Sequence, residues 1–335
     1  MIRSQPRERN RARYASRLNS FASAPEPYWG ARAVEPSVAE LIGRAATVAG
    51  LKHLDLNYPD HFTDVATDTI GAARDEGLDV SGLAMRYYTD PRFKLGAFSN
   101  PEAAVRRMAL DLTKAGIDTA AEAGVDLMTI WLGQDGFDTP FQVDYARLWE
   151  WEVEGIREVA DHNPEVDISI EYKPNEPRAF ALLPDMPTTL LAIREAGSPN
   201  LGVTLDFAHM LYANEQPAYA AMMAARHSRV LGIHLNDGYA KRDDGLMVGS
   251  VHLVQTTEML RQVRHDGYDG VIYFDTFPEV TGLDPVAECE ANIAAVEAML
   301  AVVDRVDADS RLSDAVARQD GIAAQRIVRQ CMLQN

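Results

Sequence analysis

Short runs of apolar residues recur along this chain, and most are followed by a longer stretch in which apolar residues return every three or four positions. Several of the runs are apolar at consecutive positions, as expected of parallel strands that are buried on both faces. The stretches 182–195 and 256–263 show the spacing of amphipathic helices. The eight predicted strands are residues 17–21, 53–58, 82–88, 127–131, 168–173, 202–207, 231–237 and 271–277.

Strands that alternate with helices predict an α/β fold with a parallel sheet and helices outside it. Eight such units fit a (β/α)8 TIM barrel, which typically needs about 250 residues. A doubly wound open sheet is the alternative. The chain has no Gly-x-Gly-x-x-Gly motif after its first predicted strand, so the barrel is favoured.

Two segments lie outside the predicted barrel domain, which we expect to span residues 16–300. Residues 1–15 are rich in arginine and contain no long apolar run, so they predict a flexible basic arm rather than a secretion signal. Residues 301–335 predict a C-terminal helical tail at a subunit interface. Its apolar stripe would pack on a neighbouring subunit and consists of Ile322, Ile327, Val328 and Met332.

Composition and charge narrow the classes of protein that the chain can belong to. The chain has 335 residues, of which 47% are hydrophobic, and its 50 acidic and 32 basic residues give a net charge of −18. Such an acidic chain is a poor partner for nucleic acid or for an anionic membrane. No apolar run approaches the about 18 residues needed to cross a membrane. Two isolated cysteines, Cys289 and Cys331, favour a cytoplasmic location.

Polar residues end each of the last four predicted strands, at the end of a barrel that carries the active site. These residues are Glu171, Asp206, His234 and Asp275, and about one strand-and-helix unit separates each from the next. Three buried carboxylates would repel one another unless they were protonated or neutralised by a cation. One strand-end aspartate is more often a helix N-cap, but four coincident groups favour a metal site. The ligand set suits Mn²⁺, Mg²⁺, Co²⁺ or Zn²⁺.

Lys173 follows Glu171 by two residues and therefore shares its facing on the strand. Its ammonium group would polarise a substrate oxygen beside the metal or act as an acid. The alternative is a salt bridge that balances the excess charge of the carboxylates.

The motifs that carry these residues resemble those of the xylose isomerase family, which includes L-rhamnose isomerases and other xylose isomerase-like barrels. In chain order they are WLGQDG, EYKPNEPR, GVTLDFAHM, HLND and FDTFP. The resemblance covers residues 41–300 and is strongest over 85–275. It implies a metal-dependent enzyme that interconverts an aldose and a ketose.

The resemblance also implies a role for each matching residue. The four strand-end residues would hold a first metal ion, and His209 and Asp243 would hold a second, catalytic ion. Lys173 would contact the substrate. Trp131 and Tyr88 would form aromatic walls of the sugar site.

Two positions depart from the pattern of the family. Gly245 stands where the family has another acid for the second metal, with Asp244 beside it. Asn57 stands where the family has the histidine that opens the sugar ring, although Asp60 matches the aspartate that orients it. His61 would take over this task only if its loop bends back.

Three functions remain open. The first is an isomerase that acts on an unphosphorylated sugar by a metal-assisted 1,2-hydride shift, because no Arg/Lys cluster or glycine-rich phosphate site appears at the strand ends. The second is a single-metal epimerase or a β-eliminating lyase that acts on a 3-oxo-sugar or glycoside, similar to C-glycoside deglycosidases, with His209 or Lys173 as the base. The third is a barrel that binds a sugar without catalysis, which the cost of burying the carboxylates disfavours.

The expected cofactor is one or two divalent ions per chain, with Mn²⁺ first. The expected partners are a small sugar and further copies of the chain, in a homodimer or homotetramer. A small partner subunit joins them only under the lyase hypothesis.

Overall fold

The computed structural model describes residues 12–22, 36–62 and 68–334. Eight parallel strands close into a barrel in the order β1-β10-β9-β8-β6-β4-β3-β2, which confirms the predicted (β/α)8 fold. The barrel strands are β1 (Tyr14–Arg17), β2 (His53–Tyr58), β3 (Asp79–Met85), β4 (Leu127–Trp131), β6 (Asp167–Glu171), β8 (Leu201–Asp206), β9 (Val230–Leu235) and β10 (Ile272–Phe274).

The first strand begins three residues earlier than predicted. Tyr14 pairs with Ile272 of β10 and Ala15 pairs with His53 of β2, so the strand closes the barrel. The predicted strand 17–21 is instead mostly the 3-10 helix η1 (Leu18–Ala22). Its apolar Leu18 and Phe21 are three residues apart, so one helical turn buries both on the same side. The predicted basic arm therefore ends before Tyr14, and its residues 1–11 lie outside the described part of the chain.

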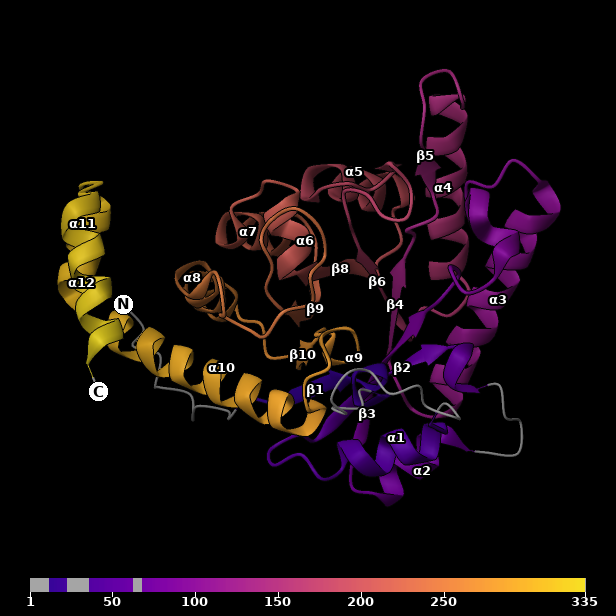
Figure 1. Cartoon of the computed structure of the whole chain (residues 1–335). Helices are drawn as coiled ribbons and strands as arrows, with labels where there is room; N and C mark the ends of the chain where they lie inside the picture. Colours follow the sequence, from indigo (N-terminus) through magenta and orange to yellow (C-terminus); the bar gives the residue numbers. More distant parts are fainter. Residues whose placement is uncertain (1–11, 23–35, 63–67, 335) are drawn as a thin grey trace.

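Helices surround the barrel (Figure 1). They are α1 (Val38–Ala45), α2 (Thr69–Asp75), α3 (Ala103–Glu122), α4 (Tyr145–Ala160), α5 (Met186–Ala196), α6 (Phe207–Tyr212), α7 (Pro217–His227), α8 (Leu253–His265), α9 (Pro278–Thr281) and α10 (Pro285–Ala308). Single 3-10 turns η2 (Asp60–Phe62) and η3 (Pro91–Leu95) follow β2 and β3. The short strands β5 (Gly136–Phe137) and β7 (Phe180–Ala181) form a separate antiparallel pair.

The tail forms two helices, α11 (Ser310–Ala317) and α12 (Gly321–Leu333), at the end of α10 that lies farthest from the barrel (Figure 1). Most residues of the predicted stripe pack against other helices of the same chain and not against a neighbouring subunit. Ile327 is buried in a small cluster with Val302 of α10, and Val328 and Met332 pack against the same cluster. Only Ile322 of the stripe stays exposed, at 77%. None of the described helices is long and apolar enough to cross a membrane.

Candidate metal centre and substrate pocket

The four strand-end residues predicted as metal ligands meet at one point. Glu171, Asp206, His234 and Asp275 each offer a ligand atom, and these atoms all lie within 4.8 Å of one another. They come from β6, β8, β9 and the residue after β10, which are four consecutive strands of the barrel wall. Asp206 and His234 are direct register partners on β8 and β9. We call these four residues the quartet.

The electrostatics of the quartet are those of crowded, buried acids. Burial raises the pKa of Asp206 to about 7, with further increases from Asp243, Glu171 and Asp275 that the nearby His209 only partly offsets. Burial also raises the pKa of Asp275. Glu171 behaves differently, because His234 overcomes the effect of burial and lowers its pKa to about 2.

The atoms of the quartet fit a divalent cation. Nδ1 of His234 lies 3.5 Å from Oε1 of Glu171, and it is a buried atom with no hydrogen-bond partner of normal geometry within the described residues. A buried nitrogen that points at a carboxylate without bonding it is arranged as a metal ligand would be. Carboxylate oxygens with one imidazole nitrogen suit Mn²⁺, Mg²⁺, Co²⁺ or Zn²⁺.

A second group of charged residues lies beside the quartet, where the resemblance implies a second metal ion. His209 faces Asp243, with Nε2 at 3.2 Å from Oδ2, and Nδ1 of His209 donates to the carbonyl oxygen of Tyr172 at 3.0 Å. The ammonium group of Lys173 lies 3.1 Å from the same Oδ2 of Asp243 and 3.3 Å from Glu176. The Asp243 carboxylate therefore already has a cation at hydrogen-bonding distance.

The loop that carries Asp243 does not bring a further acidic side chain to His209 and Asp243. Gly245 has a φ of +56°, and a Cβ there would lie 2.2 Å from the ring of Phe277, so the close approach requires glycine. The side chain of Asp244 turns back into its own loop. It accepts from the backbone N–H of Tyr239 at 2.9 Å and pairs with Arg242 at 2.7 Å.

A pocket of about 220 Å³ opens over Glu171 and Asp275 of the quartet. Tyr88 and Trp131 line it, as predicted, with ring centroids 5.6 Å apart. Nζ of Lys173 lies 5.0 Å from the centroid of the Trp131 ring. The pocket therefore combines an aromatic side with a charged floor, an arrangement that suits a small polar molecule.

His61 and Asp60, which follow β2, do not take the positions in the pocket that were considered for them from the sequence. His61 is fixed in a structural role, because its Nδ1 accepts from the backbone N–H of Asn57 at 3.0 Å and its Nε2 donates to Asn19 at 2.6 Å. It does not turn toward the pocket to replace the missing ring-opening histidine. Asp60, predicted as a catalytic residue, accepts a hydrogen bond from Thr89 at 3.2 Å and is absent from the described lining of the pocket.

Two arginines of the pocket were missed by the sequence reasoning, which found no Arg/Lys cluster at the strand ends. Arg17 ends β1 and Arg86 follows β3, and both line the pocket together with Lys173. Arg17 lies at the true end of the first strand, which the apolar pattern placed four residues too late. Arg86 stands inside the predicted strand 82–88, and a polar residue that interrupts an apolar run is the signal that would have found it.

Comparison with known proteins agrees with this geometry. The sequence profile of the family described as "Xylose isomerase-like TIM barrel" matches residues 42–299. Xylose isomerase of Thermus thermophilus is 29% identical over 210 residues, which are 61% of this chain and 54% of that protein. Xylose isomerase of Thermus caldophilus is 27% identical over the same shares. The chain thus spans about half the length of these curated relatives.

Solved structures show the same fold. A structure of L-ribulose 3-epimerase superposes with a TM-score of 0.67 at 17% identity, covering 88% of this chain and 96% of that one. A D-tagatose 3-epimerase-like protein has a TM-score of 0.67 at 15% identity, covering 87% and 98%. D-psicose 3-epimerase of Clostridium cellulolyticum H10 has a TM-score of 0.63 at 15% identity, covering 86% and 99%.

Proposed function

Because this chain belongs to the family of xylose isomerase-like TIM barrels, we propose that it is a sugar epimerase or isomerase that uses one divalent metal ion, held by the quartet. The contact between Lys173 and Asp243 is the observation that favours one bound ion over two. A second divalent ion on His209 and Asp243 would have to displace the ammonium group or lie against it, and like charges at such short range repel strongly.

When bound by the quartet, a divalent ion would supply Lewis acidity to a carbonyl oxygen of the sugar. The chain supplies the rest of the pocket. Tyr88 and Trp131 hold the apolar face of the sugar, and Lys173 presents a fixed positive charge to an oxygen on which negative charge develops. Mn²⁺ is the ion that we expect first.

Proton transfer at the carbon next to the carbonyl is the reaction that this site supports best. A hydride shift between C1 and C2 is the chemistry that the resemblance links to two ions. With a single ion held by the quartet, the ammonium group of Lys173 would stabilise the negative charge that develops on the substrate oxygen while a proton leaves and returns. The names of the similar structures, which are ketose 3-epimerases, agree with this reaction class.

Neither base considered from the sequence is free in the structure. The carbonyl of Tyr172 and the carboxylate of Asp243 both accept hydrogen bonds, so His209 is held with both nitrogens as donors. Lys173 is held as a cation between Asp243 and Glu176. Both residues therefore stabilise charge in this proposal. The proton would pass to a carboxylate that lines the pocket, Glu171 or Asp275, and would return from it to the same carbon.

The test combines metal counting with isotope exchange. Protein loaded with Mn²⁺ and desalted should hold one ion per chain, and Glu171→Gln should hold none. Glu215→Gln is the matched control, because Glu215 is a partly buried acid outside the quartet that accepts a hydrogen bond from Tyr172. Ketopentoses and ketohexoses incubated in D2O should gain deuterium at the epimerised carbon.

The aldose–ketose isomerase that works by hydride shift is the second candidate, supported by the two curated relatives. It predicts two ions per chain and an aldose product without deuterium from the solvent. Retention of Mn²⁺ by Glu171→Gln would contradict both candidates, because both depend on the quartet.

A further inference from the structure

The positive side chains of the pocket differ in how they are neutralised. Lys173 lies against Asp243 and Glu176. Arg17 pairs with Glu279 beyond the pocket, lies 3.8 Å from Asp275, and covers the ring of Phe277 at 4.9 Å. Arg86 forms no ion pair with any carboxylate in the described part of the chain.

Arg86 is held in place by a neutral residue. Its Nε donates to Oδ1 of Asn57 at 2.8 Å, and the two residues lie on neighbouring strands, at the end of β2 and just after β3. The terminal nitrogens of Arg86 have no hydrogen-bond partner among residues 12–22, 36–62 and 68–334. Asn57 is 2% exposed, and its Nδ2 is also a buried donor without a partner in these residues.

We propose that Arg86, held in place by Asn57, binds a carboxylate group of the substrate, so that the natural substrate is a sugar acid rather than a neutral sugar. The inference rests on the proposed function, because it assigns the substrate class of the same pocket. A guanidinium group presents parallel N–H donors that match the two oxygens of a carboxylate.

Because Arg86 is a single positive charge, we expect the substrate group that it binds to carry a single negative charge. A phosphate carries up to two negative charges and is usually bound by several cations or by a nest of backbone N–H groups. Among the described residues that line the pocket, Arg86 is the guanidinium without an ion pair, and the pocket volume of about 220 Å³ suits a short, single sugar unit. A keto-sugar acid of five or six carbons has a carbonyl for the metal and a carboxylate for Arg86.

The proposal also explains the residue at position 57. By resemblance, this is where the related isomerases carry the histidine that opens the sugar ring. The asparagine here is absent from the described lining of the pocket, and its side-chain oxygen holds Arg86. The position has thus become part of an anion site.

The test compares matched substrates on the full-length protein loaded with Mn²⁺. Each pair differs only at the terminal carbon, such as D-tagaturonate against D-tagatose and D-fructuronate against D-fructose. We expect kcat/KM to favour the acid by about 10–100-fold, the range for one charged hydrogen-bonded group. Arg86→Met should abolish this preference, and Arg86→Lys should keep part of it. Arg92→Met is the control, because Arg92 is an exposed arginine that pairs with Asp90.

Binding separates a failure of this proposal from a failure of the proposed function. Calorimetry with D-gluconate and with the neutral sorbitol needs no turnover, and only the acid should bind to the wild type and not to Arg86→Met. Equal binding of both compounds, or a preference for a phosphorylated sugar, would overturn the carboxylate site even if one Mn²⁺ is bound and neutral ketoses are epimerised. Loss of metal binding in Arg86→Met would show that the arginine supports the quartet and would also overturn the proposal.

Discussion

Lys173 lies two residues after the end of β6, between the carboxylates of Asp243 and Glu176, and its position bears on the number of metal ions in the site. Burial alone would lower the pKa of its ammonium group, but Asp243 and Glu176 raise it above the ordinary value, so the group is a permanent cation. The ammonium group lies against Asp243, which the resemblance implies as a ligand of a second metal ion. The positive charge of Lys173 therefore balances the negative charge of Asp243 and, in this proposal, limits the site to one metal ion.

We expect Lys173→Met to have two effects. Activity should fall about 100–1,000-fold, the loss seen when one preorganised charge-stabilising donor is removed. At millimolar Mn²⁺ the variant should also bind a second ion at His209 and Asp243, because only His209, which releases its Nε2 proton when it binds the ion, then faces Asp243. Metal analysis of both proteins measures this. Lys52→Met, at an exposed lysine outside the pocket, is the control. A stoichiometry that stays at one ion in Lys173→Met would contradict the role given to the ammonium group.

A second pair of buried carboxylates lies outside the quartet, where α4 packs against the segment that follows β4. Glu152 of α4 and Asp135 after β4 are both 0% exposed. Asp135 accepts from the backbone N–H groups of Ala97 and Ser99 and from the hydroxyl of Ser99, so it fixes the loop after η3 to the end of β4. Burial raises the pKa of Glu152 well above its ordinary value, and the neighbouring Asp135 raises it further.

The raised pKa of Glu152 predicts a dependence of stability on pH. The folded state keeps a proton on Glu152 that the unfolded state loses above about pH 4.5, so this contribution is complete below that pH. It is lost as the pH rises toward the pKa of the folded state. In Glu152→Gln, chemical denaturation from pH 4 to pH 9 should show less loss of stability at high pH. The exposed Glu154→Gln serves as the control, and an unchanged slope in Glu152→Gln would exclude this source of pH dependence.

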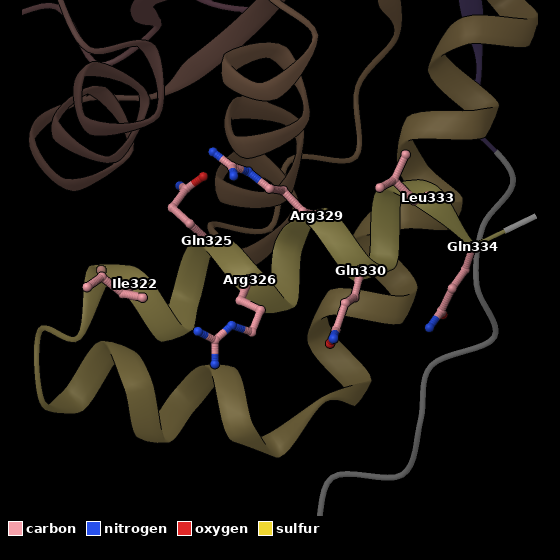
Figure 2. A pocket seen from close by; sticks show the side chains of 8 residues that line it. Ile322, Gln325, Arg326, Arg329, Gln330, Leu333 and Gln334 are labelled. Atoms are coloured by element: carbon pink, nitrogen blue, oxygen red, sulfur yellow. The ribbon is translucent and has the colours of Figure 1, made fainter.

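On the scale of the whole molecule, the tail places a partly apolar surface away from the barrel. Along one side of α12 lie Ile322 and Leu333, which are 77% and 83% exposed, with Gln325, Arg326 and Arg329 between them (Figure 2). The opposite side of α12 is already packed on α10. The oligomeric state stays a prediction. A second copy of the chain is the partner that we expect on this exposed side, because two helices held far from the barrel leave these large apolar side chains in water.

Light scattering after size exclusion tests this prediction. The wild type should form a dimer or tetramer, and Ile322→Asp with Leu333→Asp should lower the molar mass without changing the melting temperature by more than a few degrees. Leu191→Asp on α5, where the leucine is 53% exposed, is the matched control. A monomeric wild type would contradict the predicted interface.

The sequence by itself determined the repeat of strands and helices, and thereby the barrel and the meeting point of the quartet. This was possible because apolar runs mark buried strands, and closure of a parallel barrel brings the ends of successive strands together. It did not determine the first strand. Leu18 and Phe21 are apolar, as the residues of a buried strand are, but one helical turn buries both of them on the same side.

Only the tertiary structure decided which charges face one another. Arg17 and Arg86 reach the pocket from strands far from β6 in the sequence, and Lys173 meets Asp243 across 70 residues. The direction of each side chain depends on register and loop path, which periodicity does not encode. The same holds for the tail, where Ile327, Val328 and Met332 turn to α10 rather than outward. The order of the strands is therefore marked by local pattern, whereas their exact ends and the pairing of charges around them are fixed by contacts between distant segments.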